Sequence, residues 1–232
     1  MKKIFIIISS IICLHQVTLN AQKIEWGISP SCNISSFDYK DDAQFNASIF
    51  SPVNSYNPGV MAFVGFNTSS AFQVRLLAHL NFKRLKYNIL LNGAVDGYLA
   101  YDFMGYDLGL LSRYSIDVKK WKIAPGLGFF LSYNDSQGWV YKTNSTTTIA
   151  GIDPMSLDDY DTQLPLSVGA LGSLEIVPPF SLNGRTMSFQ VSGWYALKDF
   201  IDEPIKLISN SETTSVTGKY NQLSLSLNFY FK

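Results

Sequence analysis

Residues 24 to 35 read IEWGISPSCNIS, and apolar positions alternate with small or polar ones through the whole stretch. Successive side chains of a β-strand point to opposite faces, so the pattern predicts a strand with one apolar and one polar face. Strands of soluble sheets usually have about five or six residues, whereas a tilted strand that crosses a bilayer needs about nine to eleven. The stretch therefore has the length of a membrane strand.

The same alternation recurs along the chain. It is clear in residues 72–83, 121–133, 187–195 and 222–231, and less regular in 58–67, 104–114 and 164–176, which gives eight predicted strands. Short gaps (68–70, 115–119 and 178–184) alternate with long ones (38–57, 85–103, 134–163 and 198–218). Bacterial outer-membrane barrels have this rhythm of tight periplasmic turns and long external loops. We predict an all-β fold: an eight-stranded antiparallel transmembrane β-barrel, an up-and-down meander with long extracellular loops, over residues 22–232.

Residues 1–21 have the pattern of a secretory signal peptide. Lys2 and Lys3 precede an apolar core of residues 4–14, and cleavage is expected after Ala21. The apolar core is about half the ~20 residues that a spanning helix needs. Lipid attachment at Cys13 is disfavoured because Ile12 stands where a small residue is required. We expect export across the inner membrane, residence in the cell outer membrane, and Cys32 as the one cysteine left after cleavage.

Composition narrows the function classes. The chain has 18 basic and 18 acidic residues and is 16% charged and 14% aromatic, which argues against nucleic-acid binding. A soluble, secreted, lipocalin-like barrel that binds an apolar ligand inside would also alternate, with its apolar face inward and a highly charged outer face. Here the polar face consists mainly of Gly, Ser, Asn and Gln with few charges. That composition favours a narrow lumen filled by side chains.

Three of these segments resemble the small outer-membrane barrels of Bacteroidota, grouped as the PorT-like or outer-membrane β-barrel domain family. Residues 27–37 look like the family's opening run of glycines followed by Asn-x-Ser and an aromatic residue. Residues 106–114 look like its acidic-x-Pro-Leu-Leu strand, and 123–128 like its Gly-rich fifth strand. Ser31 departs from the usual glycine and Gly109 from the usual proline. The resemblance implies an eight-stranded barrel over the whole mature chain, and mostly structural or unassigned roles; it carries no secretion role over to this chain.

The polar face supplies the candidate site residues. We expect a lumen polar network of mutually neutralising side chains: Glu25, Arg75, His79, Asp107, Arg113, Lys122 and Glu175. His79 is the only imidazole after signal removal, so a lipid-acting barrel enzyme would depend on it. No serine elbow adjoins it, and a single histidine with a single cysteine makes no metal site. We therefore predict a protein that is not an enzyme and has no cofactor.

The long gaps supply a second set of candidates. Aromatic residues among adaptable polar ones are typical of recognition surfaces: Tyr39, Phe45, Tyr56, Tyr141 and Tyr160. Loops that merely keep the barrel end soluble are an alternative that the sequence leaves open. The expected partners are outer-membrane lipid and lipopolysaccharide, an unidentified loop-binding partner, and the barrel assembly machinery, which would read the last strand ending at Phe231. Acidic residues gather in the long gaps, whereas Lys119 and Lys120 mark a short one.

Overall fold

A computed structural model describes residues 24–39, 50–91, 93–143, 166–182, 184–197, 205–209, 212–216 and 218–231. The predicted signal peptide, residues 1–21, lies outside them. The strands of the described residues are β1 (Ile24–Tyr39), β2 (Phe50–Val53), β3 (Ser55–Asn67), β4 (Phe72–Leu91), β5 (Ala94–Tyr114), β6 (Ile116–Val118), β7 (Trp121–Thr143), β8 (Ser167–Val177), β9 (Ser181–Leu182), β10 (Arg185–Ala196), β11 (Ile205–Ser209), β12 (Glu212–Val216) and β13 (Gly218–Phe231).

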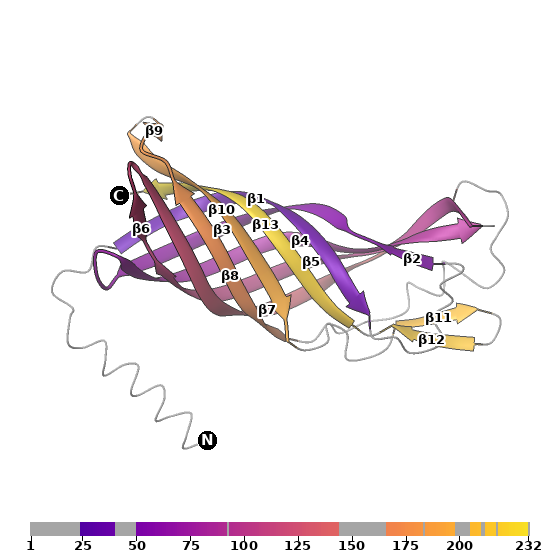
Figure 1. Cartoon of the computed structure of the whole chain (residues 1–232). Coiled ribbons are helices and arrows are strands. Elements are labelled where there is room, and N and C mark those ends of the chain that lie inside the picture. The colour runs from indigo at the N-terminus through magenta and orange to yellow at the C-terminus, as the bar shows by residue number, and fades with distance from the viewer. Residues whose placement is uncertain are drawn as a thin grey trace, which may run out of the picture.

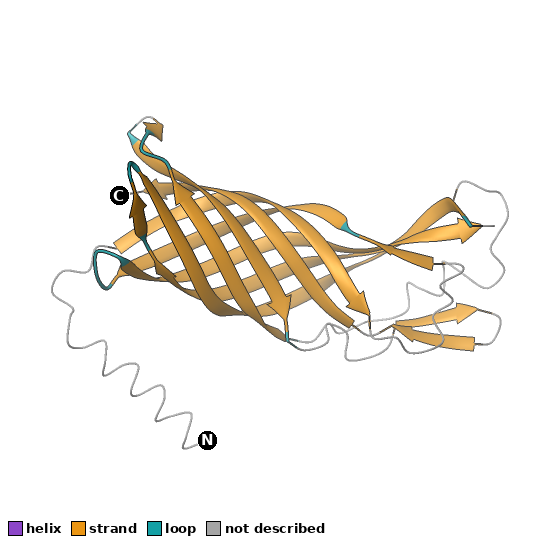
Figure 2. Ribbon diagram, in the orientation of Figure 1, coloured by secondary structure: helices purple, strands orange, loops and turns teal. Residues whose placement is uncertain are grey.

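Eight of these strands close into an antiparallel barrel (Figures 1 and 2). The order is β13-β1-β3-β4-β5-β7-β8-β10, and β10 pairs in turn with β13. The last strand thus lies between the first strand and β10, and pairs with β1 from Trp26↔Phe231 to Tyr39↔Gly218. Closure satisfies the backbone groups of every wall strand, which a structure inside a bilayer requires. The predicted fold class is confirmed.

The two ends of the barrel differ, as Figure 1 shows. The start of β1, the end of β13 and the short β3–β4, β5–β7 and β8–β10 connections lie at one end, called here the short-turn end. At the opposite, long-loop end, β4 and β5 continue past the barrel as a hairpin, paired with β2 and the end of β7. The two-stranded sheet β11–β12 lies between β10 and β13 in the chain.

The long-loop end corrects the prediction that residues 85–103 form a loop. β4 runs to Leu91 and β5 starts at Ala94, with Gly93 at φ +78° in the turn between them. Likewise β7 extends to Thr143 into the predicted 134–163 loop, and β2 occupies part of 38–57. Beyond Lys83 the inward positions of β4 become apolar. Leu85 and Tyr87 are buried there, whereas the polar side chains next to them are not. The polar side chains of this extension therefore lie on its outer face, and the apolar ones lie inside.

The wall of the barrel is apolar on its outer surface. Leu108, Leu127 and Phe129 are 62%, 77% and 57% exposed, although burial of such side chains is the rule in soluble proteins. On β4 the outward positions from Phe72 to Phe82 are Phe, Val, Leu, Ala, Leu and Phe. These outward positions, together with their counterparts on the neighbouring strands, form what we call the apolar belt.

The belt ends at charged residues on the long-loop side. Arg84 directs Nε and Nη2 at the two carboxylate oxygens of Asp102 on β5, both at 2.5 Å. The side chains are 38% and 28% exposed, and the hydrogen bonds to Asp102 raise the pKa of the guanidinium. This bidentate pair is the first charged contact on the outer face beyond the apolar belt.

Candidate functional site in the barrel lumen

Inward side chains fill the lumen in three successive layers. Along β4 the order is Arg75, Leu77 and His79, all buried, and along β5 it is Arg113, Leu111 and Asp107. From the short-turn end, β4 and β5 thus each contribute a charged residue, then an apolar one, then a polar or charged one. We call the layers the Glu175 cluster, the apolar plug and the Asp107 cluster, in order from the short-turn end.

The Glu175 cluster is built on one carboxylate from β8 and two guanidinium groups from β4 and β5. Glu175 forms salt bridges with Arg75, at 3.2 Å, and with Arg113. Its other oxygen accepts hydrogen bonds from Ser188, Asn228 and Tyr230. A buried carboxylate is tolerated only with such saturation, because an isolated charge in a low-dielectric interior is strongly disfavoured.

The apolar plug fills the middle of the lumen. Its side chains are all buried and come from six strands: Met61, Phe63, Leu77, Leu111, Phe130, Leu171 and Trp194. The Arg75 guanidinium lies 4.2 Å from the centroid of the Phe63 ring, which joins the plug to the Glu175 cluster. On the other side the plug reaches the Asp107 cluster, where the rings of Trp194 and His79 lie 5.4 Å apart.

The Asp107 cluster pairs Asp107 of β5 with Lys83 of β4. Lys83 Nζ donates to Asp107 Oδ1 at 2.8 Å, to Ser132 at 2.8 Å and to Asn134 at 3.0 Å, which uses all three ammonium protons. Asn81 Nδ2 donates to the second oxygen, Asp107 Oδ2, at 2.6 Å. The two opposite charges of this cluster neutralise each other inside the lumen.

His79 stands between a serine and an aspartate, the order of a hydrolase triad. Its Nε2 lies 3.2 Å from Ser31 Oγ, and its Nδ1 lies 3.5 Å from Asp107 Oδ2. The same Nδ1 lies 3.3 Å from Asn81 Nδ2, and the contact of that nitrogen with Asp107 fixes it as the donor end of the amide. Nδ1 thus faces an amide donor and a carboxylate acceptor: if it accepts from Asn81, Nε2 carries the proton toward Ser31, and if it donates to Asp107, Nε2 is the acceptor. A general base for Ser31 needs the second arrangement.

The remaining predicted lumen residues lie toward the short-turn end. Glu25 is half-buried and accepts a hydrogen bond from Gln73 Nε2 at 3.0 Å. Lys122 is exposed and lines the mouth of the barrel, outside the buried clusters. Lys122 is the second residue of β7 and adjoins an exposed turn, where the inward face already meets solvent.

The predicted loop-recognition residues divide into two groups. Tyr39, Tyr56 and Tyr141 lie in strands β1, β3 and β7 and not in loops, and Tyr56 faces outward at 72% exposure. Phe45 and Tyr160 lie outside the described residues. The strands run on beyond the belt, which is why these tyrosines belong to the wall.

Sequence reasoning missed several residues of the lumen. Lys83, Trp194 and Tyr230 fall on the polar face of their alternating segments, but the predicted lumen network does not include them. Their register parity was the available signal, because Tyr230 alternates with outward Phe229 and Phe231. Asn228 and Gln190 share that inward parity and join the Glu175 cluster through a 3.1 Å hydrogen bond.

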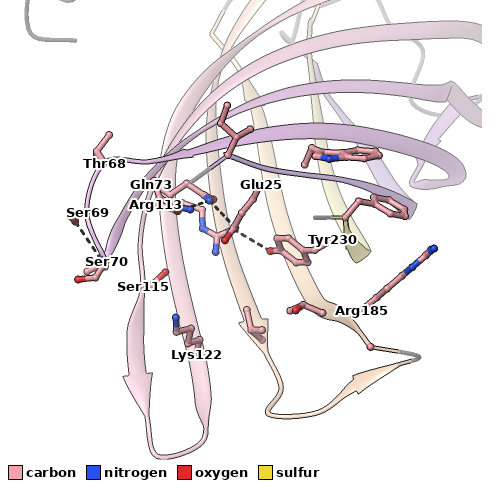
Figure 3. Close-up of a pocket in the computed structure, with 18 residues that line it drawn as sticks. Glu25, Thr68, Ser69, Ser70, Gln73, Arg113, Ser115, Lys122, Arg185 and Tyr230 are labelled. Carbon is pink, nitrogen blue, oxygen red and sulfur yellow. Dashed lines mark hydrogen bonds between the residues drawn. The ribbon is translucent and has the colours of Figure 1, made fainter. Parts of the chain in front are cut away.

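A vestibule opens below the Glu175 cluster at the short-turn end (Figure 3). Its volume is about 1190 Å³. Arg113 and Tyr230 lie at the boundary between vestibule and cluster, and Lys122 and Arg185 stand on its sides. The strands β5, β7, β10 and β13 therefore bring together residues that lie far apart in the sequence.

Among the residues that the structure describes, three or more His, Cys, Asp or Glu side chains nowhere gather in a way that could hold a metal ion. The same residues contain no helix that is long and apolar enough to cross a membrane.

Comparison with known proteins gives structural likenesses only. No protein-family model and no curated protein sequence matches the chain. The outer membrane protein OprG from Pseudomonas aeruginosa is similar, with 16% identity over 89% of this chain and 95% of that one, at a TM-score of 0.47. Neisserial surface protein A shares 11% identity over 91% of this chain and 100% of that one, at a TM-score of 0.43. E. coli outer membrane protein W shares 13% identity over 92% of this chain and 100% of that one, at a TM-score of 0.37.

Proposed function

We propose that the protein is an integral β-barrel of a bacterial outer membrane, with a filled lumen, that has a structural role and presents its long-loop end as a binding surface. The observation that carries the proposal is that apolar side chains cover the outside of the barrel and charged ones lie inside, the reverse of a soluble protein. Leu225 on the outer wall is 47% exposed, whereas Arg75 and Glu175 inside are 0% and 2% exposed. Lipid is the solvent that favours this arrangement, because it covers the belt and excludes unpaired charge.

Two features support the location within the bilayer. The outward segment from Phe72 to Phe82 has the length that a tilted strand needs to cross the hydrocarbon core. Outward aromatic residues flank the belt, among them Tyr106 and Tyr133, whose rings lie 6.1 Å apart near the long-loop side. Tyr and Trp rings favour the membrane interface because one part is apolar and the other hydrogen-bonds.

Replacement of Leu225 by Arg tests the proposal. The substitution should lower the free energy of unfolding by about 2–4 kcal/mol if Leu225 lies near the bilayer midplane. Val95→Arg is the matched control, since Val95 is 59% exposed on the hairpin beyond the belt and should tolerate the charge. Denaturant unfolding in lipid vesicles, followed by the heat-dependent shift in gel mobility, measures both. Equal, small effects would indicate a soluble barrel, as would wild-type protein recovered in periplasmic extract.

Cysteine labelling tests the orientation and the surface role. In a Cys32→Ser background, a cysteine at Ala94 on the hairpin should react with a membrane-impermeant maleimide on intact cells. A cysteine at Lys120 in the β6–β7 turn should react only after the outer membrane is permeabilised. The opposite result would place the short-turn end outside and remove the long-loop end as the surface for partners and lipopolysaccharide.

Two further assignments belong to the same proposal. Membership of the PorT-like family of Bacteroidota rests on the strand patterns of β1, β5 and β7. The role of His79 is structural and not catalytic, supported by its contact with Asn81 and by the engagement of Asp107 with Lys83. Lipid hydrolysis by the purified protein that is lost in His79→Gln, with the barrel still folded, would contradict this assignment.

A further inference from the structure

Arg185 is a cation on the outer wall of the barrel that the proposed function leaves unused. It is the first residue of β10 and is exposed, at the rim of the vestibule. The odd positions of β10 face outward, because Val191 is 43% exposed whereas Gln190 is buried. Arg185 shares the outward parity, and Figure 3 shows its side chain pointing away from Tyr230. Its guanidinium therefore lies outside the barrel and not in the lumen.

Two aromatic rings lie beside this cation. The Arg185 guanidinium is 5.0 Å from the centroid of the Phe231 ring, and that ring stacks on Trp26 with the centroids 4.6 Å apart. The three side chains come from β10, β13 and β1, which are neighbours in the barrel. We call them the Arg185 stack. The cation–π contact favours one position of the guanidinium, which lowers the entropy cost of binding a ligand there.

The outward side chains around the stack are otherwise apolar. Leu182 pairs with Arg185 on one side of the stack, and Val64 pairs with Trp26 on the other. The next row toward the middle of the barrel consists of Met187, Phe229, Ile28 and Ala62. Arg185 is thus the one charged residue in these two rows of described side chains.

Along its strand, Arg185 stands at the edge of the apolar belt. The outward positions from Met187 to Tyr195 cover about the nine residues that a tilted strand needs to cross the hydrocarbon core. Arg185 comes one outward position earlier, at the short-turn end. In the bilayer location proposed above, on which this step rests, a long cationic side chain at that level keeps its methylenes in apolar surroundings and directs its charge to the lipid headgroups.

The described part of the protein supplies no acceptor for this guanidinium. Within it, Arg185 forms neither a salt bridge nor a hydrogen bond, and the Trp26 indole N–H has no acceptor either. Glu25, which precedes Trp26, lies on the inner face of β1 and accepts a hydrogen bond from Gln73 at 3.0 Å. Two donors on the outer wall, one from each neighbour of Phe231, are therefore available to an external acceptor.

We propose that the Arg185 stack binds the headgroup of an anionic glycerophospholipid, with the phosphate at the Arg185 guanidinium and the acyl chains along Met187 and Phe229. A guanidinium matches the geometry of phosphate oxygens. The stack presents one uncompensated positive charge, which the net negative charge of a phosphatidylglycerol headgroup complements. A zwitterionic headgroup also brings an ammonium group, and the two rows contain no carboxylate to receive it.

Native mass spectrometry of the folded barrel tests the proposal. Phosphatidylglycerol or phosphatidylcholine with the same acyl chains is titrated into the detergent-solubilised protein, and the lipid-bound fraction is measured. Phosphatidylglycerol should bind saturably as one adduct, about fivefold or more tightly than phosphatidylcholine, because a cation near the membrane surface contributes on that scale. The unfolding temperature should rise with phosphatidylglycerol in parallel. Equal binding of the two lipids would overturn the proposal.

Matched variants locate the binding. Arg185→Gln should abolish the preference for phosphatidylglycerol, whereas Arg185→Lys should keep part of it, because the charge remains but the planar fork is lost. Lys120→Gln removes an exposed cation from the β6–β7 turn, outside the stack, and should change the affinity by less than about twofold. A preference that survives Arg185→Gln, or that falls equally in Lys120→Gln, would show that the stack is not the site.

Heat-modifiable migration shows whether each variant is folded. If Leu225→Arg destabilises the barrel as expected but the lipid preference is missing, the membrane location stands and the headgroup site does not. A barrel that tolerates Leu225→Arg and binds neither lipid would contradict both.

Discussion

At the scale of single residues, the lumen is organised by Glu175. One carboxylate holds two guanidinium groups and three further donors, so its loss leaves Arg75 and Arg113 buried without a counter-ion. Loss of one guanidinium leaves a neutral pair. The same cluster therefore responds unequally to substitutions at its different members.

Glu175→Gln should lower the free energy of unfolding by about 3–5 kcal/mol, the usual cost of an uncompensated buried charge. Arg113→Gln should cost less, because Arg75 still neutralises Glu175. Glu25→Gln is the control, since Glu25 is half-buried with one hydrogen bond. Denaturant titration of protein refolded into vesicles gives the ranking. If Arg113→Gln proves as destabilising as Glu175→Gln, the assignment of Glu175 as the shared counter-ion is wrong.

Glycine at the residue scale makes room for the plug. A Cβ on Gly169 would lie 2.3 Å from the Phe130 ring and 2.4 Å from the Tyr195 carbonyl oxygen. Gly193, on the neighbouring strand, would meet nothing within 4 Å. Position 169 faces the lumen, and position 193 faces outward.

Gly169→Ala should therefore destabilise the barrel by about 1–3 kcal/mol, the range found for overpacking. Gly193→Ala should stay within about 0.5 kcal/mol of wild type. Unfolding midpoints of the two variants under identical conditions test the difference. Similar midpoints would show that Phe130 can move aside without cost.

At the scale of elements, the wall strands and their extensions have outer faces of different polarity. The β4–β5 ladder continues from Phe72↔Tyr114 to Leu91↔Ala94, past the Arg84–Asp102 pair. The ladder has one register shift, between Ile89 and Leu90, and the inward face of β4 changes from polar to apolar beyond Lys83. The barrel section and the hairpin are thus parts of one ladder whose outer faces differ in polarity.

Replacement of residues 88–98 by Asn-Gly should leave the barrel folded. Tyr87 and Leu99 are directly paired, so a two-residue type I′ turn can join them. The ladder from Phe72 to Tyr87 remains and keeps the whole belt. Retained heat-modifiable migration is the expected result; an unfolded product would show that the hairpin is required for barrel formation.

At the scale of the whole molecule, the filled lumen governs passage through the barrel. Two charged clusters and the apolar plug lie in series along the lumen, and an eight-stranded wall leaves little more than side-chain space. Ions and solutes would have to displace side chains that are packed and hydrogen-bonded.

Wild-type protein in planar bilayers should accordingly give no steady conductance. Phe130→Ala/Trp194→Ala removes two plug rings that lie 5.1 Å apart and should raise it. Phe129→Ala/Tyr195→Ala removes the outward-facing neighbours on the same strands and is the matched control. Conductance in wild type, or equal behaviour of the two doubles, would contradict the role of the plug.

The sequence by itself determined the eight wall strands, their meander order and the side of the wall that faces outward. These properties follow from period-two alternation and strand length, which are local. It also identified Arg75, His79, Asp107, Arg113 and Glu175 as inward residues, because parity is a local property.

Only the tertiary structure decided which inward residues meet. Glu175 and Arg113 lie on β8 and β5, strands that do not pair with each other, and their contact crosses the lumen. The stagger of the strands around the closed barrel sets such contacts, and alternation carries no information about stagger. For the same reason Lys83, Trp194 and Tyr230 could not be assigned to their layers, and the vestibule could not be seen. The stretch from residue 24 to 35 predicts a wall, and the closure of that wall determines what the barrel encloses.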